Sequence, residues 1–108
     1  MKFRRILTLL SAMAVTGLWG WPAQAQNRGD EVLLEMQQAF RKNDAKRLSA
    51  LLPQARGHVL EPLAAYWDMR TRLDTAPASE IRSFLNTYAG SYYEDRLRND
   101  WLQQLGKR

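Results

Sequence analysis

The feature that most constrains the fold is a helical spacing of apolar residues, which recurs along the chain after residue 30. Two segments show the complete i, i+3, i+4, i+7 stripe of an amphipathic helix. The stripes are Leu48, Leu51, Leu52 and Ala55, and Ile81, Phe84, Leu85 and Tyr88. No segment shows the period-two alternation that is typical of a half-buried strand. The pattern therefore predicts an all-α protein.

Breaks between the stripes predict five helices. Their expected ranges are 30–42, 45–55, 60–73, 77–88 and 91–105. The intervening turns are only a few residues long, and short turns place neighbouring helices antiparallel to each other. Antiparallel pairs stacked in chain order form an α-solenoid. We therefore expect such a solenoid, incomplete at its C-terminal end, although no strict repeat can be aligned in the sequence.

Residues that favour helix ends support these boundaries. Asp30, Asp44 and Ser91 are predicted N-caps, and Glu94 stands three residues after Ser91, as in a capping box. Pro53 should end or kink the second helix near Leu52. Three glycines are expected to stop helices, with Gly106 in the C′ position of the last one; they are Gly57, Gly90 and Gly106.

The first 25 residues have the organisation of a secretory signal peptide. A positively charged segment, 1–5, precedes an uncharged apolar segment, 6–21, and Ala23 and Ala25 give the small-x-small pattern of a cleavage site. An uncleaved membrane anchor is the alternative, but the apolar run is short for the roughly 18–20 residues of a spanning helix. We predict cleavage after Ala25, with no membrane attachment afterwards.

Charge and cysteine content exclude several function classes. Removing Lys2, Arg4 and Arg5 from a formal net charge of +5 leaves +2 for residues 26–108, a surplus too small to indicate nucleic-acid binding. The chain contains no cysteine, which excludes disulfides, thiolate metal sites and a lipid-modified N-terminal cysteine. A domain of this size must then be stabilised by packing alone.

The sequence offers no constellation of catalytic or metal-binding residues, and we expect no cofactor. His58 is the single histidine and is interpreted as a turn or capping residue, because a catalytic or metal site would need partners. Four glutamates could serve as acids in glycan cleavage. First-turn, capping or polar-face positions account for all four, which are Glu35, Glu61, Glu80 and Glu94.

Aromatic residues divide into an interior set and a surface set. Helical spacing assigns four large side chains to packing between helices; they are Trp67, Phe84, Tyr88 and Trp101. Tyr92 lies off the stripe of the last helix and is the expected surface aromatic. With Arg96 and Arg98 it forms the candidate contact site for a glycan, another anionic polymer or a protein partner.

The last three helices resemble the N-terminal superhelical domain of soluble lytic murein transglycosylases. The resemblance is carried by PLAAYWDMRTRL (62–73), then FLNTYAGS (84–91), then EDRLRNDWLQQLGKR (94–108). It implies a periplasmic protein whose relatives cut the MurNAc–GlcNAc bond of peptidoglycan without water, leaving a 1,6-anhydro product. In that family the helices form a ring or horseshoe, and the chemistry belongs to a C-terminal lysozyme-like domain.

The resemblance carries over no catalytic residue. The family acid is a glutamate followed by serine, whereas this chain has only the reverse pair, Ser79-Glu80. We therefore expect a truncated product, a split-gene fragment or an incomplete reading of a longer gene, inactive by itself. Residues 26–108 would form the N-terminal part of an α-superhelical scaffold that holds peptidoglycan or a partner.

Two other functions compete with this scaffold. A free-standing periplasmic adaptor of the TPR-like kind is the alternative, and a small autonomous glycan-cleaving enzyme is the least favoured, since no acid has a supporting context. An unfinished solenoid should also expose part of the stripe of its last helix and offer it to a protein partner. That stripe is Tyr93, Leu97, Trp101 and Leu105.

Overall fold

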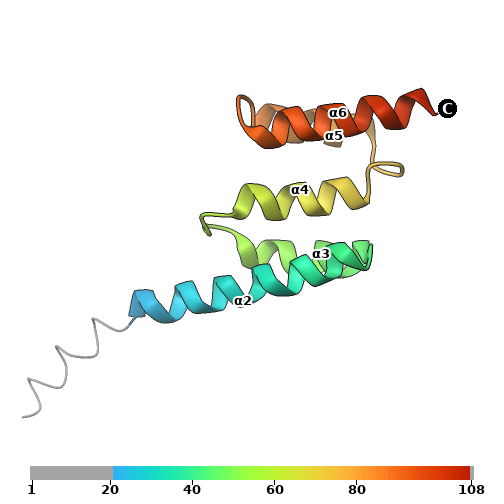
Figure 1. Ribbon diagram of the computed structural model, residues 1–108. Coiled ribbons are helices and arrows are strands. Elements are labelled where there is room, and N and C mark those ends of the chain that lie inside the picture. Colours follow the sequence, from blue (N-terminus) through green and yellow to red (C-terminus); the bar gives the residue numbers. More distant parts are fainter. Residues whose placement is uncertain (1–20, 108) are drawn as a thin grey trace, which may run out of the picture.

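The computed structural model describes residues 21–107, and every regular element in that range is helical. Figure 1 shows three layers: α2 with α3, then α4, then α5 with α6. The elements are α2 (Trp21–Arg41), α3 (Ala45–Leu51), the 3₁₀ helix η1 (Leu52–Ala55), α4 (Glu61–Thr71), α5 (Ala78–Thr87) and α6 (Tyr92–Gly106). The all-α prediction is confirmed, while the charged and apolar segments of the predicted signal peptide lie mostly outside the described residues.

The first helix begins much earlier than predicted. α2 starts at Trp21, so Asp30 lies inside the helix and the prediction of Asp30 as its N-cap is wrong. Pro22 is tolerated in a first turn, and the following alanine- and glutamine-rich segment favours helix. Helix formation therefore extends through Ala25, the predicted cleavage position. The Asp30 carboxylate bonds a histidine instead, as described below.

Two helix ends follow the sequence prediction closely. Asp44 is the N-cap of α3, and its Oδ1 accepts a hydrogen bond from the Arg47 N–H at 3.1 Å. The α-helix ends at Leu51, and Pro53 lies in the first turn of η1. A proline ring clashes with a preceding α-helical turn, which explains the change to 3₁₀ geometry at the expected place.

The start of α6 departs from the predicted capping box in one detail. Ser91 Oγ accepts the Glu94 N–H at 3.3 Å, as expected. The Glu94 carboxylate, however, accepts the Gly90 N–H at 2.8 Å, because the Ser91 N–H is already bonded to the Tyr88 carbonyl. Gly90 has φ of +82°, a conformation that suits glycine.

The predicted role of Gly106 is also corrected. This glycine is the last helical residue of α6, and Lys107 occupies the C-cap with φ of −86°. A C′ glycine would adopt positive φ, which the structure shows at Gly57 and Gly90. The helix therefore continues one residue past the expected stop.

Replacing Ser91 with alanine is expected to lower the free energy of unfolding by about 1 kcal/mol, because α6 loses its N-cap acceptor. Urea unfolding of the purified chain measures the loss as a lower midpoint at unchanged slope. Ser79→Ala is the matched control, since Ser79 is exposed near the start of α5. Equal losses in the two variants would contradict the capping role.

The interior consists of two apolar clusters that meet at α4. The first joins α2, α3 and η1 to Ala64 of α4, and the second joins α4, α5 and α6. Trp67 packs against both clusters. Of the four residues predicted to pack, Phe84 is buried, and the others are partly buried at cluster edges; these others are Trp67, Tyr88 and Trp101.

Structural features recur every 33 positions, at some pairs with the same residue and at others with a different one. Gly57 and Gly90, for example, both have positive φ and both donate their N–H to a glutamate four residues later. Five pairs share this spacing: the N-caps Asp44 and Pro77, the glycines Gly57 and Gly90, the acceptors Glu61 and Glu94, and the buried pairs Met36 with Met69 and Leu48 with Ile81. The recurrence relates α2–α3–η1 to α4–α5, and α4 to α6.

Candidate functional site

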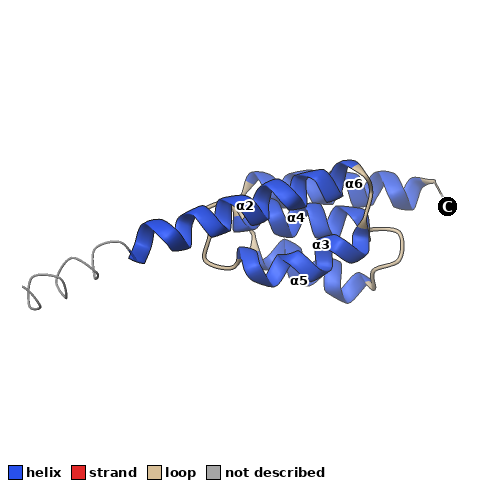
Figure 2. Ribbon diagram, turned by 90° about the horizontal axis from the view of Figure 1, so that it is seen from below, coloured by secondary structure: helices blue, strands red, loops and turns tan. Residues whose placement is uncertain are grey.

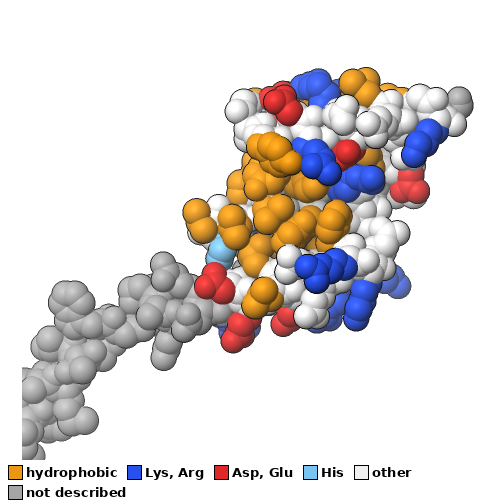
Figure 3. Space-filling model, in the orientation of Figure 1, with side chains coloured by type: hydrophobic (Ala, Val, Ile, Leu, Met, Phe, Trp, Pro, Cys, Tyr) orange, Lys and Arg blue, Asp and Glu red, His pale blue; other side chains and the backbone are white. Residues whose placement is uncertain are grey.

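An apolar groove of about 350 Å³ follows the boundary between α2 and α4. Figure 3 shows hydrophobic side chains gathered over these two helices. The groove is lined by Leu33, Leu34, Leu60, Leu63 and Trp67, with Asp30, Gln37 and His58 as its polar residues. Leu34 is 60% exposed, so its side chain is available to a ligand. A concave, mainly apolar site with a few polar groups is the usual form of a binding site.

His58 closes one end of the groove and links it to α2. Its Nε2 lies 2.6 Å from Asp30 Oδ1, and its Nδ1 accepts the Leu60 N–H at 3.0 Å. With Nδ1 acting as an acceptor, the proton of the neutral ring is on Nε2, which donates to Asp30. His58 thus bonds within the turn that precedes α4 and does not cap this helix, while its bond to α2 was not predicted.

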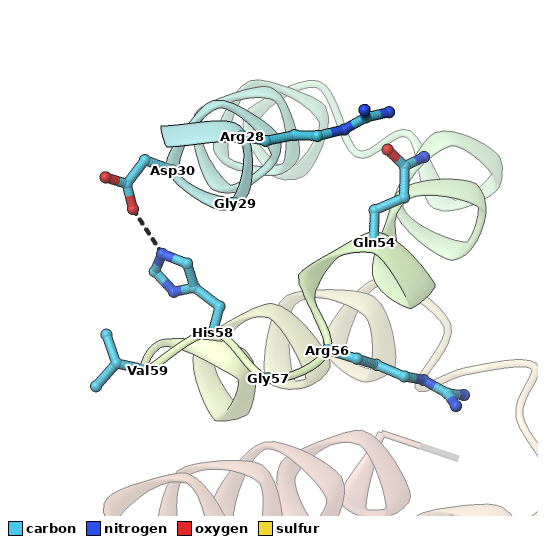
Figure 4. A pocket seen from close by; sticks show the side chains of 8 residues that line it. All are labelled: Arg28, Gly29, Asp30, Gln54, Arg56, Gly57, His58 and Val59. Carbon is cyan, nitrogen blue, oxygen red and sulfur yellow. Dashed lines mark hydrogen bonds and ion pairs between the residues drawn. The ribbon is translucent and has the colours of Figure 1, made fainter. Parts of the chain in front are cut away.

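The ring of His58 lies directly against the backbone of Gly29. A Cβ at position 29 would lie 2.8 Å from His58 Cδ2, closer than real Cβ contacts allow. Figure 4 shows the His58–Asp30 bond at one side of a second hollow of about 860 Å³, whose lining also includes Arg28 and Gln54. The absence of a side chain at Gly29 therefore lets the His58 ring pack against α2, where it lines both the apolar groove and this second hollow.

Between α4 and α6 the corresponding positions carry a polar network. The Tyr66 hydroxyl donates to Asp100 at 2.7 Å, and Arg70 approaches the same carboxylate at 3.4 Å. Burial, aided by the bond to Asp100, raises the pKa of Tyr66 to about 12, so this hydroxyl keeps its proton. In the 33-residue spacing, Asp100 corresponds to Trp67 and Tyr66 to Leu33. The apolar groove is therefore specific to the α2–α4 boundary.

The predicted contact residues on α6 divide into two groups. Tyr92 is 65% exposed, and its hydroxyl accepts a hydrogen bond from Arg96 at 3.0 Å. These two residues form one exposed pair beside the Asp100 network, because Arg96 Nε also lies 4.0 Å from Asp100. Arg98 is paired with Glu94 at 2.8 Å instead, so the structure does not bring it to Tyr92.

The four glutamates considered as acids each have a structural partner. Glu35 pairs with Arg47 at 2.8 Å on the exposed surface, and Glu61 and Glu94 accept glycine N–H groups. The bond from Gly90 is the main cause that lowers the pKa of Glu94. Glu80 bonds Arg72 at 2.6 Å, and this bond lowers the pKa of Glu80. In Glu80 and Glu94 these bonds stabilise the charged form, which is unfavourable for a general acid.

A polar network centred on a buried aspartate joins α3, α4 and α5, and it was not predicted from the sequence. Asp68 is 5% exposed, accepts the Ser49 hydroxyl at 2.7 Å and pairs with Arg72 at 2.9 Å. Arg72 also reaches Glu80, and these two bonds raise the pKa of its guanidinium. The i, i+4 spacing of Asp68 and Arg72 was the available signal, but it does not reveal the long-range partners.

Comparison of the chain with protein-family models, with curated proteins and with solved structures found no match. Across residues 21–107, no helix has both the length and the apolar character needed to cross a membrane. The same residues include no group of three or more His, Cys, Asp and Glu side chains that could hold a metal ion. The candidate site in the described part of the chain is therefore the α2–α4 groove, with Tyr92 and Arg96 as a separate exposed pair.

Proposed function

We propose that this chain is an N-terminal scaffold segment of a periplasmic lytic murein transglycosylase, with its helices stacked as an α-solenoid. The support is that the motif residues of the resemblance join α4, α5 and α6. Tyr66 bonds Asp100 across two helices, and Phe84 and Leu97 belong to one buried cluster with Tyr66. The segment positions substrate and contributes no catalytic acid.

The α2–α4 groove is the proposed contact for the glycan strand of peptidoglycan. Trp67 is partly buried, stacks on Phe40 at a centroid distance of 5.9 Å and also lines the groove. A fixed aromatic ring offers a flat apolar surface at little entropic cost, and Gln37, Asp30 and His58 supply polar groups for hydroxyl and amide groups. The exposed pair Tyr92 and Arg96 on α6 is proposed as a second contact for the same glycan strand.

Purified residues 26–108 are expected to be retained on insoluble peptidoglycan, and Leu34→Ser is expected to reduce this retention about tenfold, equivalent to about 1.4 kcal/mol. The loss follows from removing apolar surface from the groove. Leu102→Ser is the matched control, because both leucines are 60% exposed on their helices but Leu102 does not line the groove. Circular dichroism checks that both variants fold.

Two outcomes of this experiment would contradict the proposed contact. The first is that the unmodified chain is not retained, and the second is that the two leucine variants lose retention equally. Trp67→Ala supplies a second measurement and should weaken retention further, although it also removes packing against Phe40.

A free-standing TPR-like adaptor is the second candidate function, and the 33-residue spacing favours it. TPR units are about 34 residues long and consist of helix pairs, and their stacked helices form concave surfaces for partners. The downstream nucleotide sequence separates the candidates. Further helix pairs and a Glu-Ser pair in the reading frame after Arg108 would favour the scaffold, whereas an unrelated sequence would favour the adaptor.

A further inference from the structure

One face of α6 exposes large apolar side chains that the described part of the chain does not cover. Leu102 is 60% exposed and Leu105 is 41% exposed. The predicted exposed stripe is only partly correct, since Leu97 is fully buried and Tyr93 and Trp101 pack against the second cluster. The apolar surface of α6 that faces water is therefore centred on Leu102 and Leu105, next to Asn99.

The 33-residue spacing identifies what covers this face in the two preceding helices. Leu102 corresponds to Met69 in α4 and to Met36 in α2, which are 5% and 0% exposed. Met36 is enclosed in the cluster formed with α3 and with Ala64 of α4. Met69 is enclosed in the cluster formed with α5 and with Leu97 of α6. In each case a helix pair that follows in the chain covers the methionine.

The opposite end of the stack has a different character. Ala64 and Leu97, on the faces that α4 and α6 turn toward the preceding helices, are both 0% exposed. The corresponding residue of α2 is Glu31, which is exposed. A charged residue at this position suits contact with water, as expected of a terminal capping face. The α6 face carries leucines instead, so the two ends are not equivalent.

We propose that the face of α6 formed by Asn99, Leu102 and Leu105 binds one further helix pair with the apolar pattern of α5 and α6. Residues like Ile81, Phe84 and Leu85 on the first helix of this pair would cover the leucines of α6, as these α5 residues cover Met69 in the second cluster. In the longer enzyme of the proposed function, on which this inference rests, the polypeptide following α6 supplies the pair.

The test extends the chain by a copy of residues 75–107, placed directly after Lys107 so that the copied Pro77 falls at position 110. The extended chain should unfold in one transition with Tm raised by at least about 5 °C. Amide hydrogens of residues 98–106 should exchange at least about tenfold more slowly than in the unextended chain. Both results follow from burial of Leu102 and Leu105.

The control is an extension of the same length in which the copied Ile81, Phe84 and Leu85 are replaced by aspartate. This control extension should leave both the Tm and the amide hydrogen exchange of α6 unchanged. Leu102→Glu within the extended chain should abolish the gain, while the same substitution in the unextended chain changes Tm little because the residue is exposed. Sedimentation confirms that the compared chains are monomers.

The inference is overturned if the apolar extension gives no added protection in α6, or if both extensions raise Tm equally. Neither readout involves peptidoglycan. A chain that fails to bind glycan but gains protection from the extension would refute the proposed glycan contact and support the docking face. A chain that binds glycan but gains no protection would support the glycan contact and refute the docking face.

Discussion

Leu97→Ala is expected to destabilise the chain by about 3 kcal/mol, within the 2–5 kcal/mol typical of buried leucine truncation. Leu97 is fully buried where α6 meets α4 and α5, so truncation loses transfer free energy and leaves a cavity. A small single-core domain rarely has more than about 3–5 kcal/mol of stability. The variant should therefore be partly unfolded at room temperature, which far-ultraviolet circular dichroism and urea titration measure.

Leu102→Ala on the same helix provides the comparison. Its side chain is 60% exposed, and exposed substitutions usually change stability by about 0.5 kcal/mol or less. The residue type and the helix are the same, so the difference isolates burial from helix propensity. Similar losses in the two variants would mean that α6 does not pack through the face that carries Leu97.

Asp68→Ala is the second substitution expected to have a large effect, again about 3 kcal/mol. Removing one partner of a buried ion pair typically costs about 3–5 kcal/mol, because the remaining charge loses its compensation. The lower end applies here, since Arg72 is 25% exposed at its side chain and keeps Glu80. The Ser49 hydroxyl also loses its acceptor, so contacts between α3 and α4 should weaken.

Chemical denaturation measures the free energy of unfolding of Asp68→Ala and of Glu35→Ala, and so compares the loss of a buried ion pair with the loss of an exposed one. Glu35 and Arg47 are about half exposed, and such surface pairs contribute about 0–1 kcal/mol. Ser49→Ala should be intermediate, because it removes one hydrogen bond to Asp68 and leaves the ion pair. A loss for Asp68→Ala no larger than that for Glu35→Ala would show that the network contributes little to stability.

Helix ends were the part of the fold most open to prediction, because they depend on neighbouring residues. Asp44, Pro53 and Ser91 act locally through a cap or a missing N–H, and each acts where the sequence placed it. The start of α2 was missed because Asn27 and Gly29 suggest a break before Asp30, whereas the helix continues through both residues. Asp30, which was expected at the N-terminus of the helix, therefore lies in an internal turn of α2.

The candidate site and the polar network could not be predicted, because both depend on distant residues. The His58–Asp30 bond spans 28 positions and the Ser49–Asp68 bond spans 19. Neither spacing is the three or four positions that bring residues together on one helix, so the helical periodicity of the sequence does not reveal these two bonds. The 33-residue recurrence was also missed, because only a few residues repeat with it, such as Gly57 with Gly90, while others change, from Asp44 to Pro77 and from Leu48 to Ile81.

The early start of α2 has a consequence for the proposed export of the chain. If processing occurs after Ala25, the protease acts on a segment that is helical in the folded chain, so cutting must precede folding of this region or wait for it to open locally. The new α-amino group of Gln26 would then carry a positive charge at the positive end of the helix dipole, which is unfavourable. If the chain is processed in this way, its N-terminus should fray up to Asp30, where the contact with His58 is the first long-range bond to the rest of the fold.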